Sequence, residues 1–556
     1  MKISLQGAEP QTYDLCVIGS GPAGIIVALE TAALQPDWKI LLLEYGGEHD
    51  SGKNRLDDSI RVENLVNHHS PYECTNKGLG GTSSTWGGRC VMYDEVDFLD
   101  RPILDGQCTW DSAFLKGAIA HAPRAAEYFE CGRAEFDLRR QPDPARPRIA
   151  DGFVAGDVLD CMVERWSMPT RFGKRYEREI LDSQQIHLLD SFAAWQFGTA
   201  PEENKSGVRG LEIRHRTEPR TGRIRALRFV IAAGTQESTR LLLKNPGLFK
   251  RIGGSPDALG RYYQGHVSGK IASVRFYGSP AATDFGFMRD RDGSYLRRRF
   301  QFSTQALIRE NLLNTALWLD NPLYHDPKHG SGAMSFMYLM MLVPFLARRL
   351  APPAIAQSFT KGKPDRVGRH LLNILKDLPG SLWVPFSIFV RRYLLKRKLP
   401  GVFLFNPRNI YALHFHAEQL PVPKNRMELA DDGEGLLIHY GLTDGDIDSV
   451  IRCHELLDRH LRACGCGELE YWFPREQLPA AIRAMSKDGV HQSGTTRIGP
   501  TPAKGVVDGD LKVWGTDDVF VCSSSVFPTS GQANPTFFLG ACAVRLAHHL
   551  SKHAPH

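Results

Sequence analysis

The feature that constrains the fold most is a glycine-rich turn between an apolar strand and an apolar helix near the N-terminus. Residues 13–18 form an apolar run typical of a buried strand, the turn GSGPAG follows at 19–24, and the apolar segment 25–34 has helical length. A second apolar run, 39–43, ends at Glu44. This order and spacing predict a βαβ unit that binds a dinucleotide.

The residues of this unit have separate expected roles. The first glycine permits the tight turn, the second leaves room for a diphosphate, and the third allows the helix to pack on the strand. The helix N-terminus offers free N–H groups to the phosphates, and the acid at the end of the second strand can accept ribose hydroxyls. The motif does not separate FAD from NAD. The predicted contacts are Gly19, Gly21, Pro22, Ala23, Gly24 and Glu44.

Composition sets broader limits. A chain of 556 residues exceeds what one hydrophobic core usually supports, so we expect two domains. The net charge of +6 is small for this length and does not indicate nucleic acid as a partner. The eleven cysteines include no CxxC motif. The polar N-terminus lacks a signal peptide and no apolar run reaches spanning length. We therefore expect a cytoplasmic protein.

Three further segments continue the nucleotide-binding pattern. GLGGTSSTWGG at 78–88 places glycines and small hydroxyls where a backbone can run against a flat ring and a diphosphate. Segment 228–244 has the pattern of a strand, a small-residue turn and a helix, and a β-hairpin is expected before it, over 207–227. Near the C-terminus, VHQSGTTRIG at 490–499 is followed by SVFPT at 525–529 and GQANPT at 531–536.

In order and spacing these segments resemble the glucose–methanol–choline (GMC) oxidoreductases, most closely bacterial sugar or glycoside oxidoreductases and pyranose oxidase-like members. The resemblance covers both ends of the chain and 186–270, whereas 275–405 carries no recognised signature. It implies FAD as the cofactor. It also implies an α/β (α+β) fold, with a Rossmann-like FAD-binding domain and a second, substrate-binding domain built on an antiparallel sheet.

The resemblance gives an expected division of the chain. The FAD-binding domain comprises 1–100, 180–270 and 475–556, the last part carrying the catalytic residues. Residues 101–179 form a lid or excursion over the flavin, and 275–474 form the substrate-binding domain.

The resemblance also assigns roles to individual residues. His491 is expected to remove the hydroxyl proton while the carbon's hydride moves to flavin N5, and an unperturbed imidazole is largely neutral at physiological pH. Asn534 is expected to orient the substrate oxygen with its amide. The remaining FAD contacts implied are Gly80, Gly81, Thr82, Ser83, Trp86, Gly87, Gly88, Ala194, Ala233, Gly234, Ser524, Pro535 and Thr536.

Two positions depart from the family pattern. Thr85 stands where some sugar-oxidising members attach FAD through a histidine, so we expect non-covalent FAD. Ser523 stands where an aspartate is usual. We interpret His266, His414 and His416 as structural, and no histidine–carboxylate spacing predicts a metal site.

The expected reaction is FAD-dependent oxidation of an alcohol, with a sugar, glycoside or polyol as the substrate class. One alternative is a terpenoid, sterol or lipid-linked alcohol, and an alternative of another class is a lyase with structural FAD. No residue distinguishes oxygen from a quinone or cytochrome as the electron acceptor.

Charge is concentrated in 331–400, where twelve lysines and arginines face only Asp365 and Asp377. Apolar residues alternate with these basic residues. We interpret the stretch as a solvated basic face of the substrate-binding domain, with peripheral contact to an anionic membrane surface as the alternative.

Overall fold

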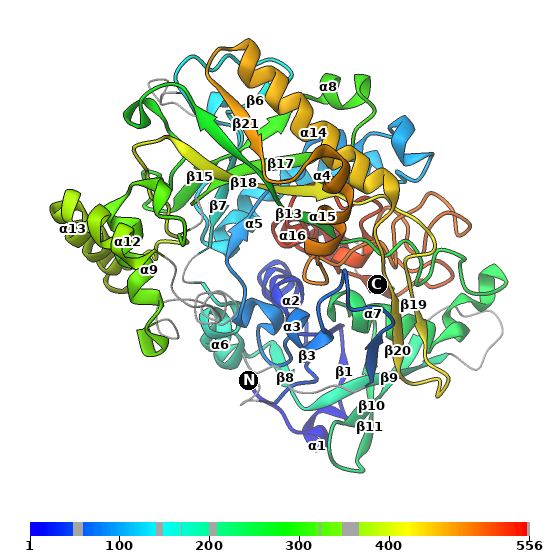
Figure 1. Cartoon of the computed structure of the whole chain (residues 1–556). Helices are drawn as coiled ribbons and strands as arrows, with labels where there is room; N and C mark the ends of the chain where they lie inside the picture. Colours follow the sequence, from blue (N-terminus) through cyan, green and yellow to red (C-terminus); the bar gives the residue numbers. More distant parts are fainter. Residues whose placement is uncertain are drawn as a thin grey trace.

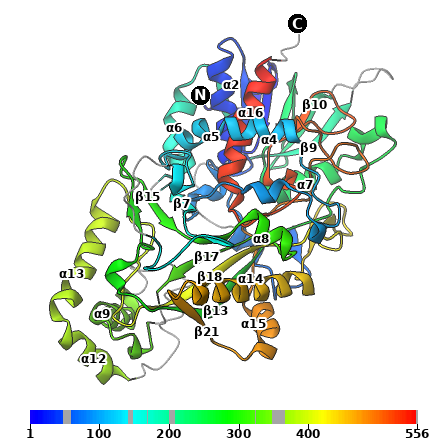
Figure 2. The same ribbon diagram turned by 90° about the horizontal axis from the view of Figure 1, so that it is seen from above.

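The computed structural model describes residues 1–47, 59–140, 148–167, 170–199, 208–321, 324–346 and 366–552. A parallel sheet with its helices forms one end of the molecule, and a larger antiparallel sheet forms the other (Figures 1 and 2). The expected fold class, a Rossmann-like domain beside a domain on an antiparallel sheet, is confirmed.

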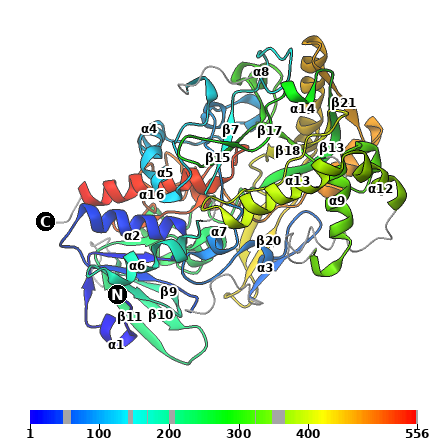
Figure 3. The same ribbon diagram turned by 90° about the vertical axis from the view of Figure 1, so that its left-hand side faces the viewer.

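The parallel sheet has the strand order β22-β12-β2-β3-β8. All residues of β2 and β3 are buried, which explains their continuous apolar runs. Helix α2 packs on the sheet, and α16 runs alongside α2 (Figure 3). The bounds are β2 Leu15–Ile18, β3 Ile40–Leu43, β8 Ile186–Leu189, β12 Phe229–Ile231, β22 Val519–Val521, α2 Pro22–Leu34, α6 Phe172–Asp182, α7 Gly234–Leu243 and α16 Pro535–Lys552.

The predicted βαβ unit is present, but its helix begins earlier than the apolar segment 25–34 indicated. Helix α2 begins at Pro22, directly after Gly21, and α7 begins at Gly234 within the predicted strand–turn–helix segment 228–244. Proline at the first position of a helix is already held at a helical φ, so the glycine-rich turn and the helix join without a spacer.

The hairpin expected over 207–227 belongs to a second sheet, of order β1-β11-β10-β9. Strands β9, β10 and β11 are antiparallel, and β1 pairs with β11 in parallel. The bounds are β1 Thr12–Tyr13, β9 Phe192–Thr199, β10 Val208–His215 and β11 Thr221–Ala226.

The antiparallel sheet has the order β21-β13-β18-β17-β16-β6. Helices α14 and α15 cover one face, and a separate hydrophobic core lies beneath them. Helix α14 begins with a capping box, in which Thr443 and Asp446 exchange hydrogen bonds. The bounds are β6 Val158–Leu159, β13 His266–Phe276, β16 Phe300–Phe302, β17 Thr315–Asp320, β18 Ile410–Glu418, β21 Gly467–Tyr471, α14 Asp444–Ala463 and α15 Leu478–Met485.

Smaller elements connect these two bodies. One sheet has the order β14-β15-β7-β5, and another has the order β19-β20-β4. Helices α9, α12 and α13 lie together at one edge of the molecule (Figure 1). The bounds are β4 Ile60–Val62, β5 Arg89–Cys90, β7 Val163–Trp166, β14 Met288–Arg289, β15 Tyr295–Arg298, β19 Arg426–Leu429, β20 Leu436–His439, α4 Ser112–Ala120, α5 Ala122–Phe129, α8 Thr304–Arg309, α9 Gly332–Met341, α12 Val367–Lys376, α13 Leu378–Phe389 and the π-helix η8 Val390–Leu394.

Several elements pack with a different domain from the one that their residue range predicted. Strand β13 begins at His266, inside 180–270, and α15 packs on β13 although it lies in 475–556. Within 101–179, β6 joins the antiparallel sheet while α4 and α5 pack on α16. Residues 101–179 therefore pack into both bodies. The functional division of the chain stays a prediction.

Candidate active site

The two glycine-rich segments meet at the N-terminus of α2. The N–H of Gly80 donates to the carbonyl of Ser20 at 2.8 Å. A Cβ on Gly81 would lie 3.2 Å from Cα of Gly21, and Gly19 has a φ of 102°. Only glycine tolerates that φ without strain and permits such close approach of two backbones. The sequence therefore places both segments at one turn.

Open space remains where a bound dinucleotide needs it. A Cβ added at Gly21, Gly87 or Gly234 would meet no atom of the described residues within 4 Å. Within the same part of the chain, no side chain caps the N-terminus of α2 or of α7. Uncapped N–H groups facing free space are what a diphosphate binds, so the residues present fit FAD.

Glu44 lies at the end of β3, as expected, and is almost fully buried. Its carboxylate accepts hydrogen bonds from the N–H groups of Gly46 and Gly78, at 2.8 and 2.9 Å. It also accepts from the N–H and hydroxyl of Ser20, at 3.0 and 2.6 Å. A carboxylate offers about four acceptor positions. A ribose hydroxyl that binds Glu44 must therefore replace a donor, and the Ser20 hydroxyl is the one that can rotate away.

Within the second glycine-rich segment, buried and exposed side chains differ in what they contact. Ser83 donates to the Gly80 carbonyl at 2.6 Å, and Trp86 donates to the Thr170 carbonyl at 3.0 Å. These two side chains anchor the segment to the protein. Thr82 and Thr85 are exposed. Gly87 is exposed and Gly88 has a positive φ of 72°.

The remaining predicted cofactor residues come from four elements. Ala194 lies on β9 opposite Ile213, and Ala233 directly precedes α7. The Ser524 hydroxyl donates to the Gln492 carbonyl at 2.6 Å, which brings it beside the loop that carries His491. Pro535 and Thr536 form the first turn of α16, so the positive end of that helix dipole lies directly after Asn534.

His491 and Asn534 are 43 residues apart and touch in the structure. The Asn534 amide nitrogen lies 2.5 Å from Nε2 of His491. The side-chain oxygen of Asn534 is buried and has no hydrogen-bond partner in the described part of the chain. The imidazole is 21% exposed. The pair therefore presents an unused acceptor and a ring nitrogen at the same point.

A buried carboxylate that the sequence analysis missed lies behind this pair. Asp488 accepts the N–H groups of Gly489, Val490 and His491 at 2.6, 2.9 and 3.1 Å, which fixes the loop. Its other oxygen lies 3.5 Å from Nδ1 of His491 and 3.3 Å from Nδ1 of His266. The spacing of an aspartate three residues before the histidine was the available signal.

Electrostatics support a charged Asp488. Burial raises the pKa of its carboxyl, but attraction to His491 and hydrogen bonds with His266 and His491 outweigh burial and hold the pKa well below its usual range. In a neutral His491 ring, Nδ1 can therefore carry the proton and point it toward the Asp488 carboxylate, which leaves Nε2 free of a proton and able to accept one from a substrate.

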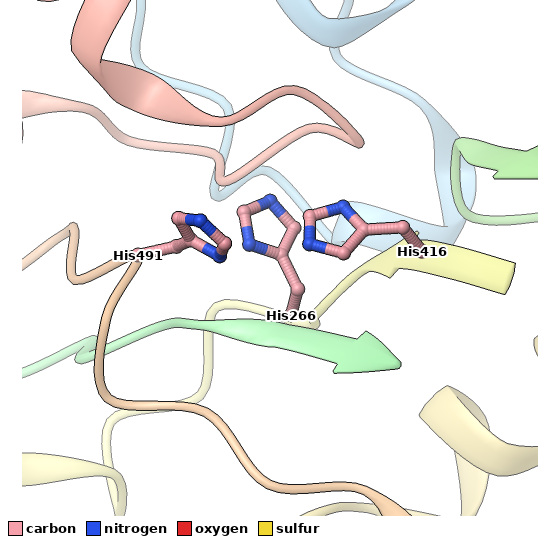
Figure 4. Close-up of side chains that lie close together, drawn as sticks. All are labelled: His266, His416 and His491. Atoms are coloured by element: carbon pink, nitrogen blue, oxygen red, sulfur yellow. The ribbon is translucent and has the colours of Figure 1, made fainter. Parts of the chain in front are cut away.

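Two further histidines gather beside His491 (Figure 4). The ring centroids of His266 and His416 lie 5.0 and 5.2 Å from that of His491. Nδ1 of His416 lies 2.8 Å from the Gln532 carbonyl and can donate to it. Burial lowers the pKa of His266 and of His416, so both rings are neutral at neutral pH. We interpreted these residues as structural, and the structure places them in the candidate site.

The three ring nitrogens lie within 4.8 Å of one another, close enough to raise the question of a metal ion. Two nitrogen ligands of a tetrahedral zinc ion, each at about 2.1 Å, lie about 3.4 Å apart with their lone pairs converging. The rings of His266 and His416 instead stack, with centroids 4.0 Å apart and planes 29° apart. Stacked rings direct their lone pairs side by side, which suits hydrogen bonds to a substrate better than metal ligation.

The antiparallel sheet supplies a polar face at this site. His266, Ser268 and Lys270 alternate along β13, and cross-strand pairing places His414 and His416 on the same face. The intervening residues point into the core under α14. His414 bonds to Ser268 at 2.9 Å and is farther along the sheet than the cluster around His491. The sequence signal was the pair of histidines two residues apart on one strand.

Comparisons with known proteins agree with this geometry. The sequence profile of the GMC oxidoreductases matches residues 421–543. 6'''-Hydroxyparomomycin C oxidase of Streptomyces lividus is 36% identical, covering 98% of this chain and 93% of that protein. Paromamine 6'-oxidase of Streptomyces fradiae is 22% identical, covering 97% of this chain and 91% of that protein. A fungal aryl-alcohol oxidase has a similar fold, with a TM-score of 0.52 at 14% identity, covering 97% of this chain and 99% of that chain.

The parallel sheet, its open glycine-lined turns and the His–Asn pair together define an FAD-dependent oxidoreductase that acts on CH–OH groups. This chain belongs to the GMC oxidoreductase family, as its identity to a relative over nearly the full length of both proteins shows.

Proposed function

We propose that this enzyme oxidises a hydroxyl group of a glycoside and that His491 and Asn534 carry the proton chemistry. The observation that carries the proposal is the convergence of Nε2 of His491 with the amide of Asn534, at 2.5 Å. Because the two side chains now touch, a substrate hydroxyl has to bind between them and separate them.

In the proposed reaction each protein group has one task. Nε2 of His491 accepts the hydroxyl proton, and the Asn534 amide donates to the substrate oxygen as negative charge develops. The Asp488 carboxylate stabilises the protonated imidazole through Nδ1. FAD, when bound, supplies the acceptor for the hydride that leaves the carbinol carbon.

The residues proposed to hold FAD lie at the uncapped helix N-termini and the glycine-rich turns. The N–H groups of Ala23 and Gly24 in the first turn of α2 would bind the diphosphate, and Glu44 would bind the ribose. The first turns of α7 and α16 would bind the flavin. We propose that FAD is not covalently attached, because Thr85 offers no ring nitrogen to the flavin.

Two observations support a glycoside as the substrate. The two relatives that align over more than 90% of their length with this chain are, by their names, oxidases of paromamine and of a hydroxyparomomycin, both amino sugar compounds. Independently, the sheet face beside His491 carries Ser268, Lys270 and His414, whose donors and acceptors suit a ligand rich in hydroxyl groups.

Charge pairing on the same face favours a neutral glycoside over a polyamine. Asp320 on this face pairs with Lys270 at 2.6 Å, and Glu164 on β7 of another sheet lies between Arg89 and Arg297. Both carboxylates are therefore already paired with cations of the protein, and neither is left to bind an ammonium group of a substrate. We infer that neutral sugars reduce the enzyme faster than polycationic aminoglycosides do.

We propose molecular oxygen as the electron acceptor, since both relatives that align over the full length are oxidases. Hydrogen peroxide formed in step with substrate oxidation in air supports this. Turnover only with a quinone or a dye, and none in air, would refute it.

The substrate class is tested by anaerobic mixing of the yellow enzyme with matched neutral glycosides, aminoglycosides and lipophilic alcohols while flavin absorbance is followed. Bleaching by the glycosides is the expected result. Bleaching by lipophilic alcohols alone would reject the substrate class. No bleaching by any class, with normal reduction by dithionite, would reject the proposed reaction.

A further inference from the structure

The helices at the edge of the molecule expose an unusual number of large apolar side chains. We call the unit formed by α12, α13 and η8 the edge helices. Half of the exposed large apolar side chains in the described part of the chain lie between residues 343 and 394. The most exposed on the edge helices are Leu372, Leu375, Leu382, Trp383, Phe386 and Leu394.

Several of these side chains are neighbours on α13. Along the edge helices Leu378, Leu382 and Phe386 follow one another at intervals of four residues and therefore share a helix face. The rings of Trp383 and Phe386 lie 5.9 Å apart. At roughly 150–250 Å² for a whole aromatic side chain, these two rings, 67% and 57% exposed, present on the order of 200–300 Å². With Leu378 and Leu382 on the same helix, the apolar area reaches the few hundred Å² at which exposed patches are often functional.

The opposite side of the same helices is anchored in the protein. His370 and Ser381 are buried, and His370 bonds to Ser335 of α9 at 3.0 Å. Ile388 packs against the core around Trp166 and Tyr295. The exposed apolar side chains therefore belong to the outer side of a folded unit. The helices of this unit lie at one edge of the molecule (Figures 1 and 2).

The charged residues around this surface indicate which kind of partner it binds. Between 366 and 398 the chain has eight lysines and arginines and one acid, Asp377. Arg369, Lys376 and Lys396 are exposed beside the apolar side chains. A second copy of the chain docked by the same face would bring these cations against each other. Helices with exposed tryptophan, phenylalanine and leucine flanked by lysine and arginine instead match the interface of an anionic bilayer.

We propose that the edge helices attach the enzyme to the surface of a membrane that contains anionic lipids. The apolar residues insert among the acyl chains near the head groups, and the basic residues contact lipid phosphates. None of the helices in the described ranges is both long and apolar enough to cross a bilayer, so the contact is peripheral. Arg348, Arg349, Lys361, Lys363 and Asp365 of the basic stretch lie outside the described residues.

The test is vesicle flotation of the full-length holoenzyme. Vesicles of phosphatidylcholine are compared with vesicles of phosphatidylcholine and phosphatidylserine, at low and high salt. Binding is expected to the anionic vesicles and to weaken with salt. Replacing three exposed cations by glutamine (Arg369→Gln, Lys376→Gln and Lys396→Gln) is expected to lower binding about 100-fold, since each basic residue near the surface contributes about fivefold.

An apolar variant and a matched control separate insertion from charge. Trp383→Ser with Phe386→Ser is expected to lower vesicle binding at least about tenfold while flavin content and turnover stay normal. Leu65→Ser with Val66→Ser removes two exposed apolar side chains elsewhere, 51% and 55% exposed, and should leave binding unchanged. No binding by the intact enzyme, or equal loss in both variants, would overturn the proposal. Self-association that Trp383→Ser abolishes, without vesicle binding, would assign the face to a second copy instead.

Discussion

Replacing Asp488 by asparagine removes one negative charge from behind the proposed base and changes little else in volume. The asparagine oxygen can still accept the N–H groups of Gly489, Val490 and His491, so the loop keeps its main constraint. The new amide group faces the backbone N–H of His266, which in the wild type donates to the Asp488 carboxylate at 2.6 Å. That mismatch costs about 1–3 kcal/mol of stability.

The expected loss of activity follows from the distance. At 3.5 Å from Nδ1 of His491, a carboxylate stabilises a protonated imidazole by about 5 kcal/mol for an effective dielectric constant near 20. The ring is partly exposed to solvent, so about 3–4 kcal/mol is a better figure, and about 1.4 kcal/mol corresponds to a tenfold change in rate. We expect Asp488→Asn to lower the rate of flavin reduction on the order of 10²–10³-fold.

The assay is anaerobic stopped-flow reduction, with bound FAD counted by absorbance. Asp446→Asn is the matched control: Asp446 is buried and accepts N–H groups of Leu420 and Thr443 at 2.8 and 2.7 Å. It should lose stability but not activity. A wild-type rate of flavin reduction in Asp488→Asn would refute the reasoning.

Three other predictions concern stability and cofactor binding. Burial lowers the pKa of His454 to about 4. The contribution of the neutral His454 side chain to the free energy of unfolding is therefore complete above about pH 6.5, the pKa in the unfolded chain, and is lost as the pH falls toward 4. Between pH 7.5 and pH 5, His454 should contribute about 2 kcal/mol to the loss of unfolding free energy measured in urea, and His454→Leu should reduce the total loss by that amount. An unchanged difference between the two pH values in the variant would count against it. Acid precipitation should release all the FAD into the supernatant, whereas flavin retained in the pellet would contradict the role given to Thr85. Gly21→Val should give folded, colourless protein, because a Cβ at this position meets no atom of the described residues within 4 Å and the side chain would occupy the space proposed for the diphosphate. Gly24→Ala should fail to fold, because its Cβ would lie 1.9 Å from the Gly19 carbonyl oxygen. A yellow Gly21→Val protein would argue against the proposed diphosphate site.

The nucleotide-binding half could be predicted from the sequence because its signals are local. The turn at Gly19, the apolar strand before it and the acid at Glu44 lie within one βαβ unit, where spacing alone constrains geometry. The helix starts were less predictable. Periodicity detects the apolar face of a helix but not the first turn, which Pro22 supplies.

The rest of the site depends on contacts between distant segments. His266 and His416 lie 150 residues apart on paired strands, and nothing local indicates that their rings stack beside His491. Asp488 acts through a loop whose path is set by hydrogen bonds, with no periodic pattern to detect. The sequence also left open whether the outer face of the edge helices is a solvated face or a membrane contact, for a related reason. Amphipathic sequence does not say which side of a helix packs inward when partners such as Ser335 on α9 come from another segment.

The most direct test of the central claim is the rate of anaerobic flavin reduction by a substrate glycoside in the variant His491→Ala, with FAD content equal to that of the wild type. General-base catalysis contributes typically 10²–10⁴-fold, so reduction should slow by about that factor, and Asn534→Ala should slow it to a smaller extent. A His491→Ala enzyme that binds FAD and is reduced at the wild-type rate would contradict the assignment of His491 as the base.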